Sequence, residues 1–143
     1  DDDETSIVHG DYRLDNMILK DNQVMGILDW ELSTLGHPIA DFSYHCLSWR
    51  TQEAFWDQSK LKELGIPNER EYMDMYCENT GKDLSKNWEF YMAFNMFKIA
   101  GILQGILGRV RDGTASSKHA EDRGMMVYPL SEAAWNTIKE NLL

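Results

Sequence analysis

The sequence predicts an α+β fold that is mainly α-helical. Residues 1–36 hold short apolar runs of strand length, whereas the rest of the chain follows a helical repeat with recognisable helix starts and stops. Hydrophobic residues make up 43% of the 143 residues, which is enough nonpolar surface for the core of one domain. We therefore expect residues 1–143 to form a single domain.

Three short strands are expected near the N-terminus. Residues 5–8 and 24–28 are apolar or β-branched, and residues 17–20 are expected to pair between them. The turn before the last strand is Asp21-Asn22-Gln23, which contains residue types that accept tight-turn geometry. The segment 31–36 is predicted to be a loop.

Five helices are expected after the strands. The first begins at His37-Pro38, because proline in a first helical turn removes no hydrogen bond, and this helix should be largely buried. The second runs from residue 51 to about residue 64. The third begins at a capping box formed by Asn68 and Glu71 and ends at Gly81.

The fourth helix is predicted to be the longest. It covers residues 85 to about 111 and carries apolar residues on every face, so we expect it to be covered nearly all round. Residues 115–124 are small and polar, which is typical of a flexible loop. A last helix is expected from about residue 130 to residue 143.

Composition narrows the choice of partners and compartment. A formal net charge of −10 disfavours nucleic acid as a partner, and an acidic surface favours cationic small molecules over ligands rich in phosphate. Cys46 and Cys77 match no metal spacing, so we interpret them as reduced core residues of an intracellular protein. No membrane span is expected, because Asn95, Lys98 and Gln104 interrupt the longest apolar stretch.

The candidate chemistry lies in residues 7–30. Asp11, Asn16 and Asp29 place oxygen-bearing side chains at the ends of predicted strands. In phosphoryl transfer by kinases, an Asp receives the proton of the acceptor hydroxyl, an Asn five residues later binds a metal ion, and a second Asp after the next hairpin binds it too. Mg²⁺ prefers such oxygen ligands and keeps several waters. We interpret Asp11 as the catalytic base and Asn16 and Asp29 as metal ligands.

Two motifs carry a family resemblance. His9-Gly10-Asp11 and Leu28-Asp29-Trp30 resemble the aminoglycoside phosphotransferase and choline kinase branch of the kinase-like fold. Residues 29–38 with Ala40-Asp41 are similar to the phosphotransferase-like domain of acyl-CoA dehydrogenase family members 10 and 11. The resemblance implies the C-terminal lobe of a protein-kinase-like fold, with a short β-hairpin region at the catalytic loop and about five helices.

The same resemblance implies an enzyme that phosphorylates a hydroxyl group of a small molecule. The donor would be ATP or GTP with Mg²⁺, and the acceptor an aminoglycoside, a choline-like molecule or a hydroxyacyl-CoA. The sequence contains no Gly-x-Gly-x-x-Gly loop, so the nucleotide-binding residues of the N-terminal lobe are unknown and expected outside this chain. We expect a piece of a longer protein, inactive alone, that self-associates or depends on the missing lobe.

Supporting roles are expected for residues around the motif. His9 should hydrogen-bond backbone near the metal-binding Asp, and Arg13 is a candidate for contacting phosphate or substrate. For Asp15, a local cap or an ion pair with Arg13 is favoured over metal binding. The resemblance implies that Asp41 braces the catalytic loop.

Several alternatives stay open. His37, Asp41 and His45 share one helical face and could mimic a metal site, although packed or solvated side chains are favoured. A noncatalytic scaffold is the rival function, whereas the lack of an Ala-Pro-Glu motif disfavours a protein kinase. The resemblance implies an acceptor pocket built from helices after Asp29, whereas core packing is the favoured interpretation of each candidate: Glu31, Tyr44, Trp49, Tyr72, Tyr91 and Asn95.

Overall fold

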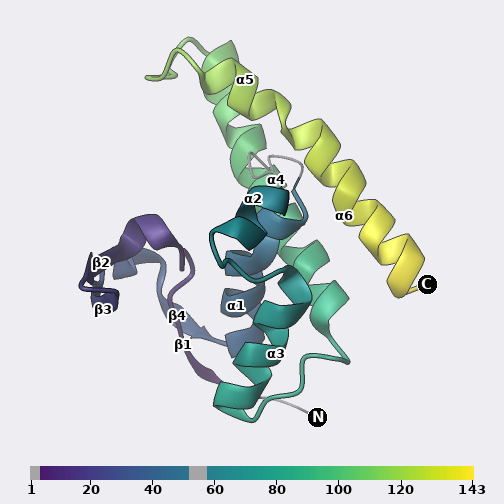
Figure 1. Cartoon of the computed structure of the whole chain (residues 1–143). Helices are drawn as coiled ribbons and strands as arrows, with labels where there is room; N and C mark the ends of the chain where they lie inside the picture. Colours follow the sequence, from purple (N-terminus) through teal and green to yellow (C-terminus); the bar gives the residue numbers. More distant parts are fainter. Residues whose placement is uncertain (1–3, 52–57) are drawn as a thin grey trace. The chain divides into compact units, whose positions relative to one another are not determined.

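The computed structural model describes residues 4–51 and 58–143 and confirms the predicted fold class (Figure 1). Most of the described chain is helical, and the strands are confined to its first 36 residues. The chain divides into two compact units, Asp1–Trp88 and Glu89–Leu143, which are considered separately below.

A β-hairpin in the first unit carries one end of the candidate site. Strand β2, Met17–Lys20, pairs antiparallel with β3, Gln23–Ile27, and Lys20 lies opposite Gln23. Asp21 and Asn22 form the turn with φ angles of 51° and 60°, the left-handed geometry of a two-residue hairpin turn. The predicted hairpin is therefore present, with Gln23 in the strand and not in the turn.

The predicted pairing of the first strand was wrong. Strand β1, Ser6–Val8, pairs antiparallel with β4, Thr34–Gly36, and not with β2, so there are two separate two-stranded sheets. The expected loop 31–36 instead contains β4, preceded by a 3-10 turn at Trp30–Leu32. Close approach at Gly10 allows this return, because a Cβ there would lie 2.5 Å from the carbonyl oxygen of Leu32.

Helices in the first unit follow the start and stop signals predicted from the sequence. Helix α1, Pro38–Cys46, starts at Pro38 with His37 as its N-cap, as predicted, and continues into a 3-10 turn at Leu47–Trp49. Helix α2 covers Gln58–Glu63, and the expected helical residues 52–57 lie outside the described residues. Helix α3, Glu69–Thr80, has the predicted capping box.

Aromatic residues form much of the core of the first unit. The ring of Phe42 on α1 stacks on Tyr76 of α3 with a centroid separation of 3.9 Å, and Trp88 lies 5.7 Å away. Tyr72 of α3 stacks on Trp49 at 5.3 Å. These contacts hold α1 against α3, and α1 also contacts β1. The helix that positions the candidate site is therefore fixed on two sides.

The second unit contains most of one long helix and two shorter ones. Helix α4, Trp88–Arg111, begins three residues later than predicted, after a turn in which Asp83 accepts a hydrogen bond from the backbone N–H of Ser85. Helices α5, Ala120–Met125, and α6, Val127–Asn141, contact each other. The expected loop 115–124 was thus too long, and the last helix begins earlier than expected. A Cβ at Gly124 would lie 2.6 Å from the side chain of Leu107, so glycine allows α5 to approach α4.

The expectation that α4 is covered nearly all round was wrong. Buried positions follow one stripe of the helix: Trp88, Met92, Met96 and Ala100. Another face is about half exposed, and it carries Phe90, Phe94 and Phe97. Within the described residues, α4 is the one helix long and apolar enough to cross a membrane, a test that core helices of water-soluble proteins also pass.

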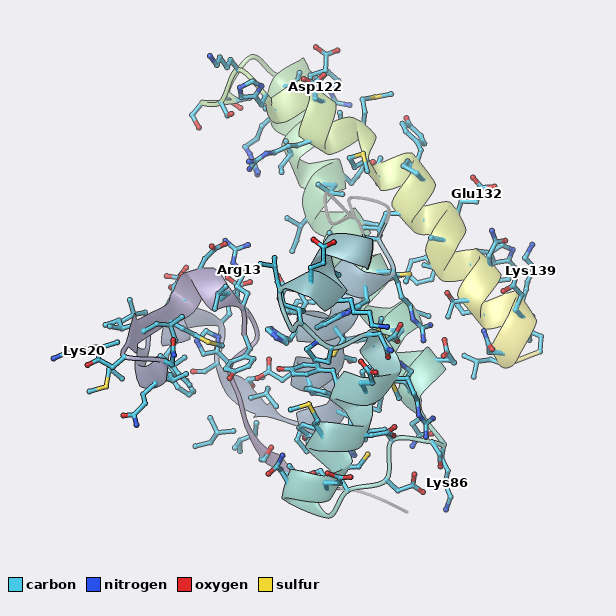
Figure 2. The ribbon with its side chains drawn as sticks, viewed as in Figure 1. Arg13, Lys20, Lys86, Asp122, Glu132 and Lys139 are labelled. Carbon is cyan, nitrogen blue, oxygen red and sulfur yellow. The ribbon has the colours of Figure 1, made fainter. Side chains whose placement is uncertain are left out.

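Several charged side chains lie at exposed positions on the hairpin and on α6. Figure 2 shows Lys20 at the end of the hairpin and Glu132 and Lys139 along α6, each directed away from its ribbon. These positions are exposed, as expected for an acidic chain that keeps its charges in solvent.

Candidate functional site

The β2–β3 hairpin brings two predicted metal ligands to the same end of a ladder. Asn16 directly precedes β2 and Asp29 follows two residues after β3. The backbone N–H of Leu28 donates to the carbonyl oxygen of Asn16 at 2.8 Å, which extends the ladder past Met17 and Ile27. The pairing of β2 with β3 therefore brings Asn16 and Asp29 to the same end of the hairpin, as the sequence spacing predicted.

Asp11 is tied to Asn16 and to helix α1. The side-chain amide of Asn16 donates to the Asp11 carbonyl oxygen at 2.8 Å and to Asp11 Oδ2 at 3.0 Å. The hydroxyl of Tyr44 donates to Asp11 Oδ1 at 2.7 Å. Each carboxylate oxygen of Asp11 therefore has one donor, and its side chain remains 22% exposed. A carboxylate held in this way can still accept a hydrogen bond from a further hydroxyl.

Asp41 braces the backbone before Asp11, as the resemblance implied. Its Oδ2 accepts from the His9 N–H at 2.6 Å and its Oδ1 from the Gly10 N–H at 2.8 Å. Asp41 lies in the first turn of α1, where a carboxylate is also favoured by the helix dipole. Two successive N–H groups bound by one carboxylate fix the direction in which the loop leaves β1.

His9 links the loop to the end of the hairpin. It is 3% exposed, and its Nε2 lies 2.7 Å from the carbonyl oxygen of Leu28, next to Asp29. Because a carbonyl only accepts, Nε2 carries the proton, and Nδ1 is free to accept from the backbone N–H of Asp11 at 3.3 Å. The predicted hydrogen bond of His9 is present, and it joins the Asp11 loop to the Asp29 strand.

Asp29 presents its carboxylate from an uncommon backbone conformation. Its φ and ψ are 64° and 54°, in the left-handed region, which Asp enters more readily than most residues. The residue is exposed, and among the described residues its carboxylate accepts no hydrogen bond. Strained conformations at polar residues often accompany functional sites.

The donor set suits a hard cation. The Nδ2 group of Asn16 donates to Asp11, so the Oδ1 atom of Asn16 can serve as a ligand of a cation. Asp29 supplies a carboxylate. Oxygen atoms of this kind, together with phosphate oxygens, are the ligands that Mg²⁺ takes in nucleotide sites. Asn16 and Asp29 therefore fit the metal that the family resemblance implies.

A second metal site on α1 is not supported. His37 Nδ1 accepts from the backbone N–H of Ile39 at 3.2 Å, and Asp41 is engaged by the loop. His45 Nδ1 donates to the Tyr12 carbonyl oxygen at 3.3 Å. Across residues 4–51 and 58–143 there is no group of three His, Cys, Asp or Glu that could hold a metal. The face shared by His37, Asp41 and His45 serves hydrogen bonding.

Arg13 forms the ion pair that the sequence offered as the alternative for Asp15. Its guanidinium lies 3.2 Å from Asp15, and its Nε lies 3.8 Å from Asp11 Oδ2. Arg13 is about half exposed, so the pair with Asp15 adds little stability.

Burial shifts the pKa values of two side chains on α1. Burial, followed by the hydrogen bond to Asp11, raises the pKa of Tyr44 to about 12. Burial also lowers the pKa of His45, against the opposing effects of the Tyr12 carbonyl and of Asp41. Both side chains are therefore neutral near neutral pH, and both act as hydrogen-bond donors to the loop.

Comparison with known proteins agrees with this geometry. Residues 1–76 match the model of the phosphotransferase enzyme family, APH. The chain belongs to this phosphotransferase family. It is 44% identical over 139 residues to acyl-CoA dehydrogenase family member 10 of Mus musculus, covering 92% of this chain and 13% of that protein. It is 38% identical over 137 residues to family member 11 of Homo sapiens, covering 92% and 18%.

A solved structure shows the same fold. The crystal structure of a candidate aminoglycoside phosphotransferase from Ralstonia eutropha matches with a TM-score of 0.85 and 50% identity, over 95% of this chain and 43% of that one. The phosphotransferase domain described here therefore spans less than half of that chain and under a fifth of the curated relatives above. The kinase-like fold predicted from the motifs is confirmed.

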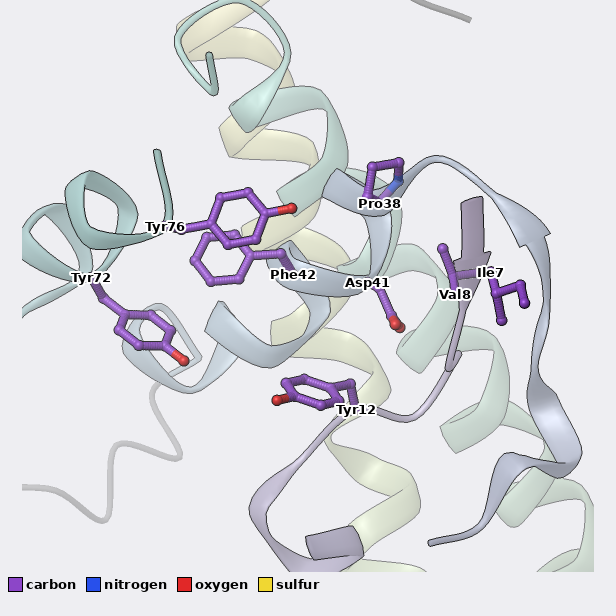
Figure 3. A pocket seen from close by; sticks show the side chains of 8 residues that line it. All are labelled: Ile7, Val8, Tyr12, Pro38, Asp41, Phe42, Tyr72 and Tyr76. Carbon is purple, nitrogen blue, oxygen red and sulfur yellow. The ribbon is translucent and has the colours of Figure 1, made fainter. Parts of the chain in front are cut away.

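A pocket of about 300 Å³ opens beside the loop of the phosphotransferase domain (Figure 3). Tyr12, the residue after Asp11, forms one wall, and Tyr72 and Tyr76 of α3 form another. Asp41, Phe42 and the β1 residues Ile7 and Val8 complete the lining together with Pro38. Half of the lining residues are aromatic, and the one carboxylate among them, that of Asp41, is already bound to backbone N–H groups.

The expected acceptor residues separate in the structure. Tyr72 lines the pocket, and the ring of Trp49 stacks on the ring of Tyr72. Glu31, by contrast, is exposed in the turn after Asp29. Tyr91 and Asn95 belong to the second unit. Sequence reasoning missed the contact of Tyr44 with Asp11, although Tyr44 lies three residues after Asp41 and hence on the same helical face.

Proposed function

We propose that this domain is the C-terminal lobe of an ATP- and Mg²⁺-dependent phosphotransferase that phosphorylates a hydroxyl group of a small molecule. The observation that carries the proposal is the joint placement of three residues. Asn16 contacts Asp11 directly, and the hairpin register presents Asp29 at the same end. Membership of the phosphotransferase family supports the reaction class.

Asp11 is the proposed base. Its carboxylate accepts a hydrogen bond from the acceptor hydroxyl and orients that oxygen toward the γ-phosphorus of ATP. The acceptor oxygen forms a bond to phosphorus, the bond from phosphorus to the bridging oxygen of ADP breaks, and the hydroxyl proton passes to Asp11. Asn16 and Asp29 would hold Mg²⁺, which neutralises phosphate charge when bound.

The acceptor class is proposed from the relatives and the charge of the chain. The Ralstonia eutropha protein is a candidate aminoglycoside phosphotransferase, and the curated relatives are acyl-CoA dehydrogenase family members. A net charge of −10 favours cationic acceptors such as aminoglycosides or choline over a hydroxyacyl-CoA. All three classes carry a hydroxyl group, and the assay must therefore include each of them.

The test is acceptor-dependent ADP release by the full-length protein. Wild type is compared with Asp11→Asn and with Asp15→Asn, a matched change at an exposed neighbour that pairs with Arg13. Loss of a general base lowers turnover by about 100-fold or more, so we expect this effect for Asp11→Asn and little change for Asp15→Asn. Equal rates in all three proteins would contradict the assignment of Asp11.

A noncatalytic binding module is the second candidate. The observation in its favour is the half-exposed aromatic face of α4 at Phe90, Phe94 and Phe97, since such faces often bind other proteins. A well-folded full-length protein that binds no Mg-ATP and turns over no acceptor would support this candidate over the enzyme.

A further inference from the structure

We propose that Tyr44 is a positioning residue that fixes the orientation of the Asp11 carboxylate for phosphoryl transfer. The inference rests on the proposed function, because it assigns Tyr44 a role in the reaction for which Asp11 is the base. It differs from the sequence expectation, which placed Tyr44 among the candidates for an acceptor pocket.

One face of α1 holds four successive residues of the loop. Asp41 binds the backbone N–H groups of His9 and Gly10, and His45 binds the carbonyl oxygen of Tyr12. Between these two backbone anchors, Tyr44 binds the side chain of Asp11. Asp41, Tyr44 and His45 are spaced i, i+3 and i+4, so all three point from the same side of the helix.

The backbone anchors cannot by themselves set the plane of the Asp11 carboxylate. The terminal torsion of an Asp side chain is broad, so the carboxylate rotates easily unless both oxygens are held. In this structure Tyr44 donates to Oδ1 at 2.7 Å, and Asn16 donates to Oδ2 at 3.0 Å. Removing the Tyr44 hydroxyl leaves one oxygen without its protein donor, while the backbone anchors of the loop remain.

Tyr44 can keep this role through the working pH range of ordinary enzymes. Burial and the contact with Asp11 raise its pKa to about 12, so the phenol stays protonated and donates its hydrogen. The ring is half-buried on α1, which limits its own movement. A rigid donor on a helix is a more precise support than a group on a loop.

The test uses full-length protein with Tyr44→Phe, and Tyr128→Phe as a control at an exposed tyrosine of the second unit. We expect Tyr44→Phe to lower kcat about tenfold while KM for acceptor and for Mg-ATP stays within about twofold, because only alignment is lost. Tyr128→Phe should match wild type. Unchanged kcat in Tyr44→Phe, or a raised KM accompanied by a lowered melting temperature, would overturn the proposal.

A measurement that needs no turnover separates this proposal from the proposed function. In protein labelled with ¹³C-aspartate, the Asp11 carboxyl resonance is assigned by its loss in Asp11→Asn. We expect Tyr44→Phe to move that resonance and Tyr128→Phe to leave it in place. A resonance that does not move overturns the positioning role, whereas a moved resonance in a protein without turnover supports the contact and overturns the proposed reaction.

Discussion

Replacing Asp41 by Asn tests how strongly α1 holds the candidate catalytic loop. The carboxylate accepts two backbone N–H groups, from His9 at 2.6 Å and from Gly10 at 2.8 Å. An Asn side chain has one carbonyl oxygen, so it can keep one of these hydrogen bonds. Its NH₂ group would then face the other backbone N–H, donor against donor.

We expect Asp41→Asn to lower the free energy of local opening of the loop by about 2 kcal/mol. A hydrogen bond to a charged group contributes about 1.5–3 kcal/mol, and we take the lower part of this range because Asp41 is half-buried and still reached by solvent. A free-energy change of about 2 kcal/mol corresponds to about 30-fold faster hydrogen exchange when opening limits exchange.

Hydrogen–deuterium exchange of the full-length protein measures this effect locally. Peptides that cover residues 7–12 should exchange about 30-fold faster in Asp41→Asn. Asp15→Asn should leave them unchanged, because Asp15 is exposed and pairs with the half-exposed Arg13. Unchanged exchange of residues 7–12 in Asp41→Asn would refute the claim that Asp41 braces the loop.

Three further predictions follow from contacts away from the reacting atoms. Burial lowers the pKa of His45 below its ordinary 6.5, so the unfolded chain binds a proton at a higher pH than the folded chain does. The folded state therefore loses stability as the pH falls below 6.5. The variant His45→Asn keeps a donor for the Tyr12 carbonyl oxygen, and its melting temperature should depend less on pH between 7 and 5. A wild-type slope in that variant would contradict this. Glu69 accepts from Arg50 at 2.7 Å and from Trp88 at 2.8 Å, so Glu69→Ala should lower the free energy of unfolding by about 3 kcal/mol in urea titrations, and a loss below about 1 kcal/mol would contradict that. The aromatic face of α4 should make the isolated chain self-associate, and Phe94→Glu should weaken this in light scattering; a dilute monomer of the wild-type chain would count against it.

Features set by near neighbours could be predicted from the sequence. The capping box of α3 depends on Asn68 and Glu71, and both reciprocal hydrogen bonds are present at 2.9 Å. The hairpin turn at Asp21 and Asn22 is a similar case, because residue types that tolerate positive φ mark it directly. The placement of Asn16 and Asp29 at one end of the β2–β3 hairpin likewise depends only on the residues between them.

Features set by contacts between distant residues could not be predicted from the sequence. The pairing of β1 with β4 depends on the turn at Trp30–Leu32 and on space at Gly10, neither of which appears in the strand periodicity. Apolar residues on every face of α4 gave no information about which face is covered. Tyr44 and Asp11 lie 33 residues apart, so their contact appears only once α1 has packed beside β1.

The most direct test of the proposed function is phosphorus NMR of full-length protein incubated with Mg-ATP and each acceptor class. We expect a new phosphomonoester signal, formed together with ADP, for wild type and for Asp15→Asn, and no such signal for Asp11→Asn. Release of inorganic phosphate without a phosphomonoester, or an equal signal from Asp11→Asn, would contradict the proposed function.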